Sequence, residues 1–110
     1  MAITVNIYYR GIDGSARKFA EEMVSSGVVS AIRAENGNLR YEYFFPMEDE
    51  ETVLLIDSWK DQGSIDEHHA SAMMEKIMEL REKYNLHMRV ERYISDEAGV
   101  SETDKAFIRE

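Results

Sequence analysis

The stretch that decides the fold is TVLLIDSWKDQGSIDEHH, residues 52–69. Residues 53–56 form an uninterrupted apolar run, which favours a strand buried on both faces. Asp57 interrupts the run, and Trp59, the only tryptophan of the chain, follows two residues later. Because side chains alternate along a strand, Asp57 and Trp59 should point to the same face of the sheet.

A helix is expected directly after this strand. Residues 64–67, Ser-Ile-Asp-Glu, fit the S-x-x-E capping box, so the helix should begin at Ser64 after a turn at Gly63. His68 and His69 then lie on the same helix as Ile65, three and four residues further on. The strand and the helix therefore bring a tryptophan and a histidine close to the junction between them, and we predict that this junction is the functional site.

The rest of the chain alternates between strand and helix patterns. Period-two alternation predicts further strands over residues 3–10, 38–46 and 86–95, and helical spacing predicts helices over 15–35 and, after a kink near 70–71, up to residue 84. The order is β-α-β-β-α-β, which matches the ferredoxin-like arrangement. We therefore predict an α+β fold in which a four-stranded antiparallel sheet has helices on one face.

The other face of this sheet is expected to contact a second copy of the chain. It carries aromatic and aliphatic residues, and an uncovered apolar sheet face is typical of an interface. We predict a homodimer packed sheet to sheet. The domain should span residues 1–95, and the polar tail 96–110, with a second capping box at Ser101, should form either a short helix docked on the partner or a loosely ordered end.

Composition restricts the class of protein. The 110 residues are 44% hydrophobic, which supports a single domain with a real core. The chain has no run of 18 apolar residues, and its alternating start is unlike a signal peptide, so neither a membrane span nor secretion is expected. The absence of cysteine fits a cytoplasmic protein, and the net charge of −9 argues against binding to nucleic acid.

Three residues are the candidate catalytic groups: Asn6, Trp59 and His68. The indole N–H of Trp59 could donate to a ligand oxygen, although a lone tryptophan also fits a core. Asn6 could line a cavity as a donor, or it could be satisfied by backbone or water. His68 could transfer a proton near neutral pH, or lie at the surface. The hypothesis requires that all three converge around one enclosed cavity.

Further residues are candidates for contact with a substrate. They are large apolar, aromatic or imidazole side chains that would suit a soft cavity, although they would also suit an ordinary core: Tyr8, Tyr43, His69, Met73 and Ile77. His68 and His69 are adjacent and cannot chelate one ion as residues four apart do, so no metal site is predicted. The chain has no glycine-rich phosphate loop and no G-x-S-x-G motif.

Two segments resemble the antibiotic-biosynthesis monooxygenase family, particularly its quinol-monooxygenase-like members. Residues 35–42, ENGNLRYE, are similar to the family's E-x-G-x-x-x-Y-x turn into the second strand. Residues 54–59, LLIDSW, are similar to its apolar strand that ends in acid-x-Trp, and a helix with a histidine at the place of His68 follows. The resemblance covers roughly residues 3–95 and implies a dimeric α+β barrel.

The resemblance also implies a cofactor-independent oxygenase, which oxidises small quinols, phenols or anthrones with O2 and needs neither metal nor flavin. Trp59 and Asn6 would hold ring oxygens, His68 would assist proton transfer and Tyr43 would line the pocket. Anthrone-oxidising relatives have an asparagine four residues before the tryptophan, where this chain has Leu55. Haem-degrading relatives have a histidine on the later helix, where this chain has Met74, Ile77 and Met78, so haem degradation is not expected. A non-catalytic dimer that binds or senses small aromatics is the alternative.

Overall fold

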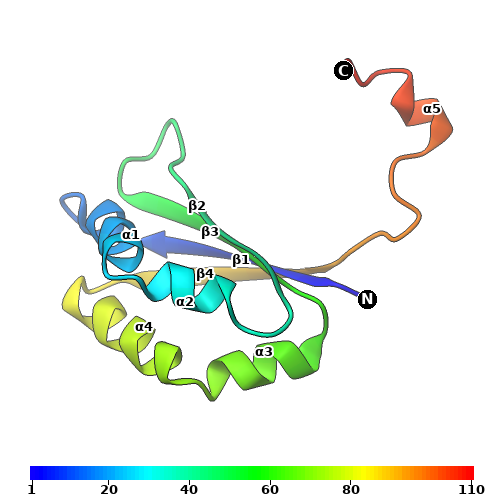
Figure 1. Cartoon of the computed structure of the whole chain (residues 1–110). Helices are drawn as coiled ribbons and strands as arrows, with labels where there is room; N and C mark the ends of the chain where they lie inside the picture. The colour runs from blue at the N-terminus through cyan, green and yellow to red at the C-terminus, as the bar shows by residue number, and fades with distance from the viewer.

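The computed structural model describes all 110 residues and has the predicted element order. The elements are β1 (Ile3–Arg10), α1 (Ser15–Ser25), α2 (Val28–Arg33), β2 (Asn38–Phe44), β3 (Thr52–Trp59), α3 (Gln62–His69), α4 (Ala72–Lys83), β4 (His87–Ile94) and α5 (Glu102–Lys105). The four strands form one antiparallel sheet in the order β2-β3-β1-β4, and α1 to α4 gather on one of its faces (Figure 1). The ferredoxin-like α+β prediction is confirmed.

The register of β1 on β3 decides which side chains face the helices. Ile3 pairs with Trp59 and Val5 pairs with Asp57, so the odd-numbered residues of both strands share the helix-covered face. Asn6 pairs with Ile56, and these even-numbered residues point to the open face. The core lies under the helices, where Trp59 and the other large buried side chains pack, including Tyr9, Phe19, Met23, Ile32, Leu55 and Ile77.

The region predicted as one helix over residues 15–35 is two helices. α1 ends at Ser25 and α2 begins at Val28, because Gly27 between them has a φ of 87°. This left-handed conformation ends a helix, and glycine adopts it without a steric penalty. The break turns the chain, so that α2 packs against β2 and α4.

α3 begins two residues earlier than the capping box suggests. It starts at Gln62, and Asp61 is its N-cap, whose carboxylate accepts the Ser64 N–H at 2.9 Å and the Ser64 hydroxyl at 2.8 Å. The N-cap of α3 is therefore Asp61, where the sequence pattern predicted Ser64. The predicted interruption near residues 70–71 is confirmed, since α3 ends at His69 and α4 begins at Ala72.

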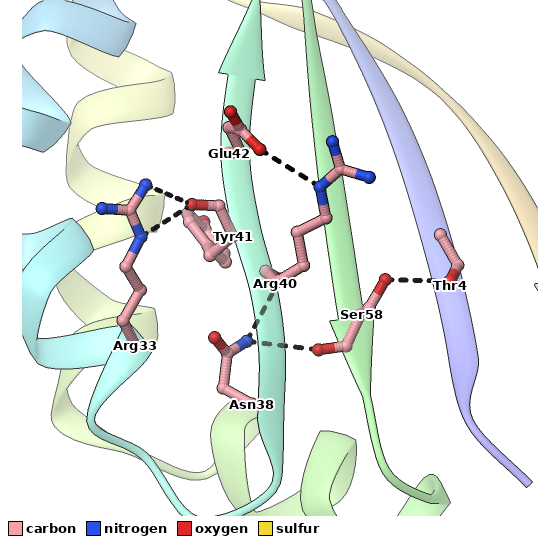
Figure 2. A network of polar contacts seen from close by, with 7 residues as sticks. All are labelled: Thr4, Arg33, Asn38, Arg40, Tyr41, Glu42 and Ser58. Carbon is pink, nitrogen blue, oxygen red and sulfur yellow. Dashed lines mark hydrogen bonds and ion pairs between the residues drawn. The ribbon is translucent and has the colours of Figure 1, made fainter. Parts of the chain in front are cut away.

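Polar contacts fix the edge strand β2 on the body. At the end of α2, Arg33 donates to the Tyr41 carbonyl from Nε at 2.9 Å and from Nη2 at 2.7 Å (Figure 2). The same figure shows Thr4 and Ser58 joined across β1 and β3 by a hydroxyl–hydroxyl bond of 2.8 Å on the open face. The register of β2 on β3 pairs Tyr41 with Asp57, so the Tyr41 side chain faces the helices.

The C-terminal segment leaves the body after β4 and carries α5 at its far end (Figure 1). The helix predicted from the capping box at Ser101 is present, and the Ser101 hydroxyl accepts the Asp104 N–H at 3.1 Å. Phe107 beyond it is 86% exposed. No helix of the chain has the length and apolar character needed to cross a membrane.

Gly37→Ala is expected to destabilise the fold by about 2–5 kcal/mol, as the sum of a left-handed backbone penalty and overpacking. Gly37 has a φ of 84°, and a Cβ there would lie 2.1 Å from the Ser64 Oγ and 2.7 Å from the Ser64 Cβ. Gly27→Ala is the matched control, because Gly27 has a φ of 87° and nothing within 4 Å of such a Cβ. Urea unfolding should show a larger loss for Gly37→Ala, and equal losses would contradict the close approach to α3.

Candidate active site

A cavity of about 300 Å³ lies between the sheet and the helices α3 and α4. Its lining comes from three strands and two helices: Val5, Ile7, Asp57, Trp59, Gln62, Ile65, His68, His69, Met74, Arg81, Met88, Val90 and Arg92. Four larger hollows, of about 520, 530, 420 and 330 Å³, lie elsewhere on the surface, and none of them is lined by a buried carboxyl or imidazole. The cavity at α3 and α4 contains both, so it is the candidate site.

Asp57 is the acidic group of the cavity. It is 8% exposed, and its Oδ1 accepts the indole N–H of Trp59 at 2.6 Å. Burial raises the pKa of Asp57 to about 7, although the bond from Trp59 and the positive charge of Arg81 oppose the rise. A carboxyl with this pKa can accept or release a proton near neutral pH.

His68 and Glu35 form a second pair of ionisable groups. The His68 Nδ1 lies 2.7 Å from the Oε2 of Glu35, which lies in the connection between α2 and β2. Burial lowers the pKa of His68, and the contact with Glu35 opposes this. With the carboxylate accepting from Nδ1–H, the other ring nitrogen is left as an acceptor. The imidazole also packs against Trp59, with ring centroids 4.8 Å apart, so the indole lies beside both an acid and a base.

Arg81 brings positive charge into the cavity from α4. Its Nη2 donates to the Tyr9 hydroxyl at 2.8 Å, and its Nε is buried without a partner. Burial raises the pKa of Tyr9, and Arg81 opposes the rise, so the phenol remains a neutral partner of the guanidinium near pH 7. The cavity thus combines a carboxyl, an imidazole and a guanidinium on an apolar background.

A family model described as "Antibiotic biosynthesis monooxygenase" matches residues 2–80. The chain belongs to the antibiotic biosynthesis monooxygenase family. Membership supports a monooxygenase-like function at the level of the family and leaves the substrate open.

One curated protein is similar to the chain in sequence, and solved structures are similar to it in fold. YcnE of Bacillus subtilis (strain 168), named as an inferred monooxygenase, is 33% identical over 54 residues, which cover 47% of this chain and 57% of YcnE, so the match spans little more than half of that relative. A Methanosarcina mazei protein has the same fold with a TM-score of 0.74, 21% identity and coverage of 87% and 94% of the two chains. SnoaB of Streptomyces nogalater, a cofactor-independent oxygenase solved as a point mutant, has a TM-score of 0.71, 10% identity and coverage of 86% and 92%.

Only some of the site residues that were predicted from the sequence line the cavity. Trp59, His68 and His69 line one cavity, as expected. The expectation that Asn6 and Tyr8 join them is wrong, because both side chains lie on the open face while Trp59 lies on the other. The cause is the alternation of β1, since residues at even positions cannot reach a cavity lined by Val5 and Ile7.

Three other predicted contacts do not line this cavity. Ile77 is 1% exposed and belongs to the core, and Met73 packs against that core from the same helix. Tyr43 faces the helices but lines a separate hollow beside α1, with Ala20 and Val24. Met74, the neighbour of Met73, is the methionine of α4 that reaches the cavity.

Three functional groups were missed from the sequence: Glu35, Asp57 and Arg81. The sequence did indicate Asp57. An acid that follows an apolar run in a strand, two residues before a tryptophan, is a candidate for burial, and burial of an acid is costly enough to suggest a function. No sequence pattern indicated Glu35 or Arg81, because each contacts its partner across a long sequence separation. No group of three or more His, Cys, Asp or Glu side chains is arranged to hold a metal ion.

Proposed function

We propose that the chain is a cofactor-independent monooxygenase that oxidises a small quinol, phenol or anthrone-type aromatic with O2. The observation that carries this proposal is the buried Asp57, whose pKa is raised to about 7 at the wall of a cavity also lined by Trp59 and His68. Such a carboxyl suits the first step of this chemistry, which is removal of a proton from an electron-rich ring.

The cavity supports an aromatic occupant. Its volume of about 300 Å³ lies at the lower end of the range of small-molecule sites, and Val5, Ile7, Ile65 and Met74 give it apolar walls. Apolar walls exclude water and strengthen the electrostatic interactions of the charged groups inside. A ring bound there would lie against the Trp59 indole, within reach of both Asp57 and His68.

The proposed reaction balances with O2 as the only oxidant. For an anthrone-type substrate, Asp57 accepts a proton from the CH2 group, and the resulting carbanion gives one electron to O2. Combination of the two radicals forms a carbon–oxygen bond, and a proton returned by Asp57 yields a hydroperoxide. Loss of the remaining C–H proton to the neutral His68 and departure of hydroxide leave a ketone, and His68 then gives this proton to the hydroxide, which forms water. One oxygen atom enters the product and the other enters water.

Oxygen uptake by metal-free protein with a panel of quinols and anthrones tests the proposal. Uptake that Trp59→Phe abolishes is the expected result, because the indole donates to Asp57 and packs against His68. Tight binding of the same compounds without uptake would contradict it and would favour the alternative, a non-catalytic module that binds small aromatics.

We also propose that two copies of the chain pack through their open sheet faces. Tyr8, Leu54 and Ile56 are only half-covered there, although they are large and apolar. The Asn6 Oδ1 is buried among them without a hydrogen-bond partner. A second copy would cover the apolar side chains and could supply the missing donor. Residues 96–110 would extend from one copy toward the other.

Ile56→Arg is expected to convert the dimer to a monomer, because it places a long charged side chain among the apolar residues of the open face, between Tyr8 and Leu54 on one side and Glu42 on the other. Size-exclusion chromatography with light scattering should give twice the chain mass for the wild type and the single mass for the variant. Met47→Arg is the control, since Met47 is exposed in the β2–β3 connection. A monomeric wild type, or an Ile56→Arg protein that remains dimeric, would contradict this interface.

A further inference from the structure

The charged residues that line the cavity are mostly basic, whereas the chain as a whole is acidic. The protein has 22 acidic against 13 basic residues, yet two arginines line the cavity and Asp57 is its only acid. Neither Arg81 nor Arg92 forms an ion pair with any carboxylate. A positively lined cavity in an acidic protein raises the local concentration of anionic ligands.

Arg81 is incompletely paired within the cavity. Its guanidinium donates to the neutral Tyr9 hydroxyl, lies 5.4 Å from the centre of the Tyr9 ring and contacts the Met78 sulfur from Nη1 at 4.0 Å, and its Nε is buried without an acceptor. A guanidinium has five N–H donors, and leaving them unpaired in an apolar site is costly. Arg81 therefore favours an occupant that carries negative charge.

Arg92 reaches the same cavity from β4. Its backbone pairs with Val5, which puts its side chain on the helix-covered face, and its Nη2 donates to the Gln62 Oε1 at the start of α3. Gln62 is a neutral acceptor, and its own amide also donates to Asp66 at 2.9 Å. The exposed guanidinium is thus directed to the cavity by a contact that an anionic ligand could replace with a stronger, charge-assisted one.

We propose that the natural substrate is an aromatic acid, a hydroxylated ring whose carboxylate binds Arg92 while Arg81 adds positive potential from within. This inference rests on the proposed function, because it names the substrate class of the same cavity. The carboxylate fixes the ring by one end, and its hydroxyl then points inward to Asp57 and His68. Neutral rings of the same size lack the interaction with Arg92 and bind more weakly.

Anaerobic calorimetric titration with 6-hydroxy-2-naphthoate and its methyl ester tests the inference, since the two differ in charge and share the ring. The acid is expected to bind about 10- to 100-fold more tightly than the ester to the wild type, as charge-assisted hydrogen bonds imply. Arg92→Gln should bring this ratio close to one. Arg89→Gln is the matched control, because Arg89 lies on the same strand but pairs with Tyr8 on the open face.

Equal binding of acid and ester by the wild type, or equal loss of the preference in Arg89→Gln and Arg92→Gln, would overturn the inference. Its failure is separable from failure of the oxygenase proposal, because no turnover takes place in these titrations. A preference for the acid in a protein that consumes no oxygen supports the inference and removes the oxygenase. Oxygen uptake with neutral quinols and no preference for the acid removes the inference alone.

Discussion

Asp57→Asn is expected to lower kcat/KM for oxygen uptake about 10²- to 10⁴-fold, the usual contribution of a general base. The amide retains the size of the carboxyl and can still accept the indole N–H of Trp59, so the cavity should keep its shape. What it cannot do is take a proton from the substrate. The measurement is the initial rate of oxygen uptake with the best quinol or anthrone of the panel.

The dependence of the rate on pH separates this role from a structural one. Since the pKa of Asp57 is about 7, kcat/KM of the wild type should rise with pH and level off above that value. The residual rate of Asp57→Asn should lack this rise. Asp13→Asn, at an exposed turn, is the control for the change from carboxyl to amide. An Asp57→Asn variant with wild-type rates would eliminate Asp57 as the base.

The same substitution is expected to stabilise the folded protein at high pH. Burial raises the pKa of Asp57 from its ordinary 3.8 to about 7, so between these values the folded state holds a proton that the unfolded state has released. The free energy of unfolding therefore falls as pH rises through this window, by about 1.4 kcal/mol for each pH unit and on the order of 4 kcal/mol in total. Above pH 7 the folded state carries the full cost of a buried carboxylate.

Urea unfolding of the wild type and Asp57→Asn across pH 4 to 8 measures this contribution directly. The advantage of the variant should be small at pH 4, grow with pH, and reach its maximum above about 7. Loss of activity together with a gain of stability is typical of a residue kept for function. A stability difference that does not change with pH would show that Asp57 is solvated in the folded state.

The fold was predictable because its signals are local. Alternation in residues 3–10, the apolar run before Asp57 and the helical spacing after His69 each need only neighbouring residues. The same alternation contained the evidence against Asn6, since Ile3, Val5 and Ile7 form one face and Asn6 belongs to the other. In the structure Ile3 pairs with Trp59, so the odd-numbered residues of β1 share the face of Trp59 and Asn6 lies on the opposite face. The alternation of β1 together with this pairing would have separated Asn6 from Trp59.

The rest of the site depends on contacts that no local pattern encodes. Glu35 meets His68 across 33 residues, and Arg81 meets Tyr9 across 72. Their approach follows from the break at Gly27 and from how α4 packs against α1, α2 and α3, and both depend on the tertiary structure. Helix ends were similarly underdetermined, because Asp61 and Ser64 are both good capping residues and only the three-dimensional path decides between them.

The position of Trp59 gives the protein a built-in optical probe. It is the only indole of the chain, it is 1% exposed, and it touches the two groups whose protonation governs the cavity. Fluorescence excited at the red edge of indole absorption would thus come from one known location without labelling. Its intensity would report proton gain and loss at Asp57 and the arrival of an occupant as they happen, on the timescale of rapid mixing.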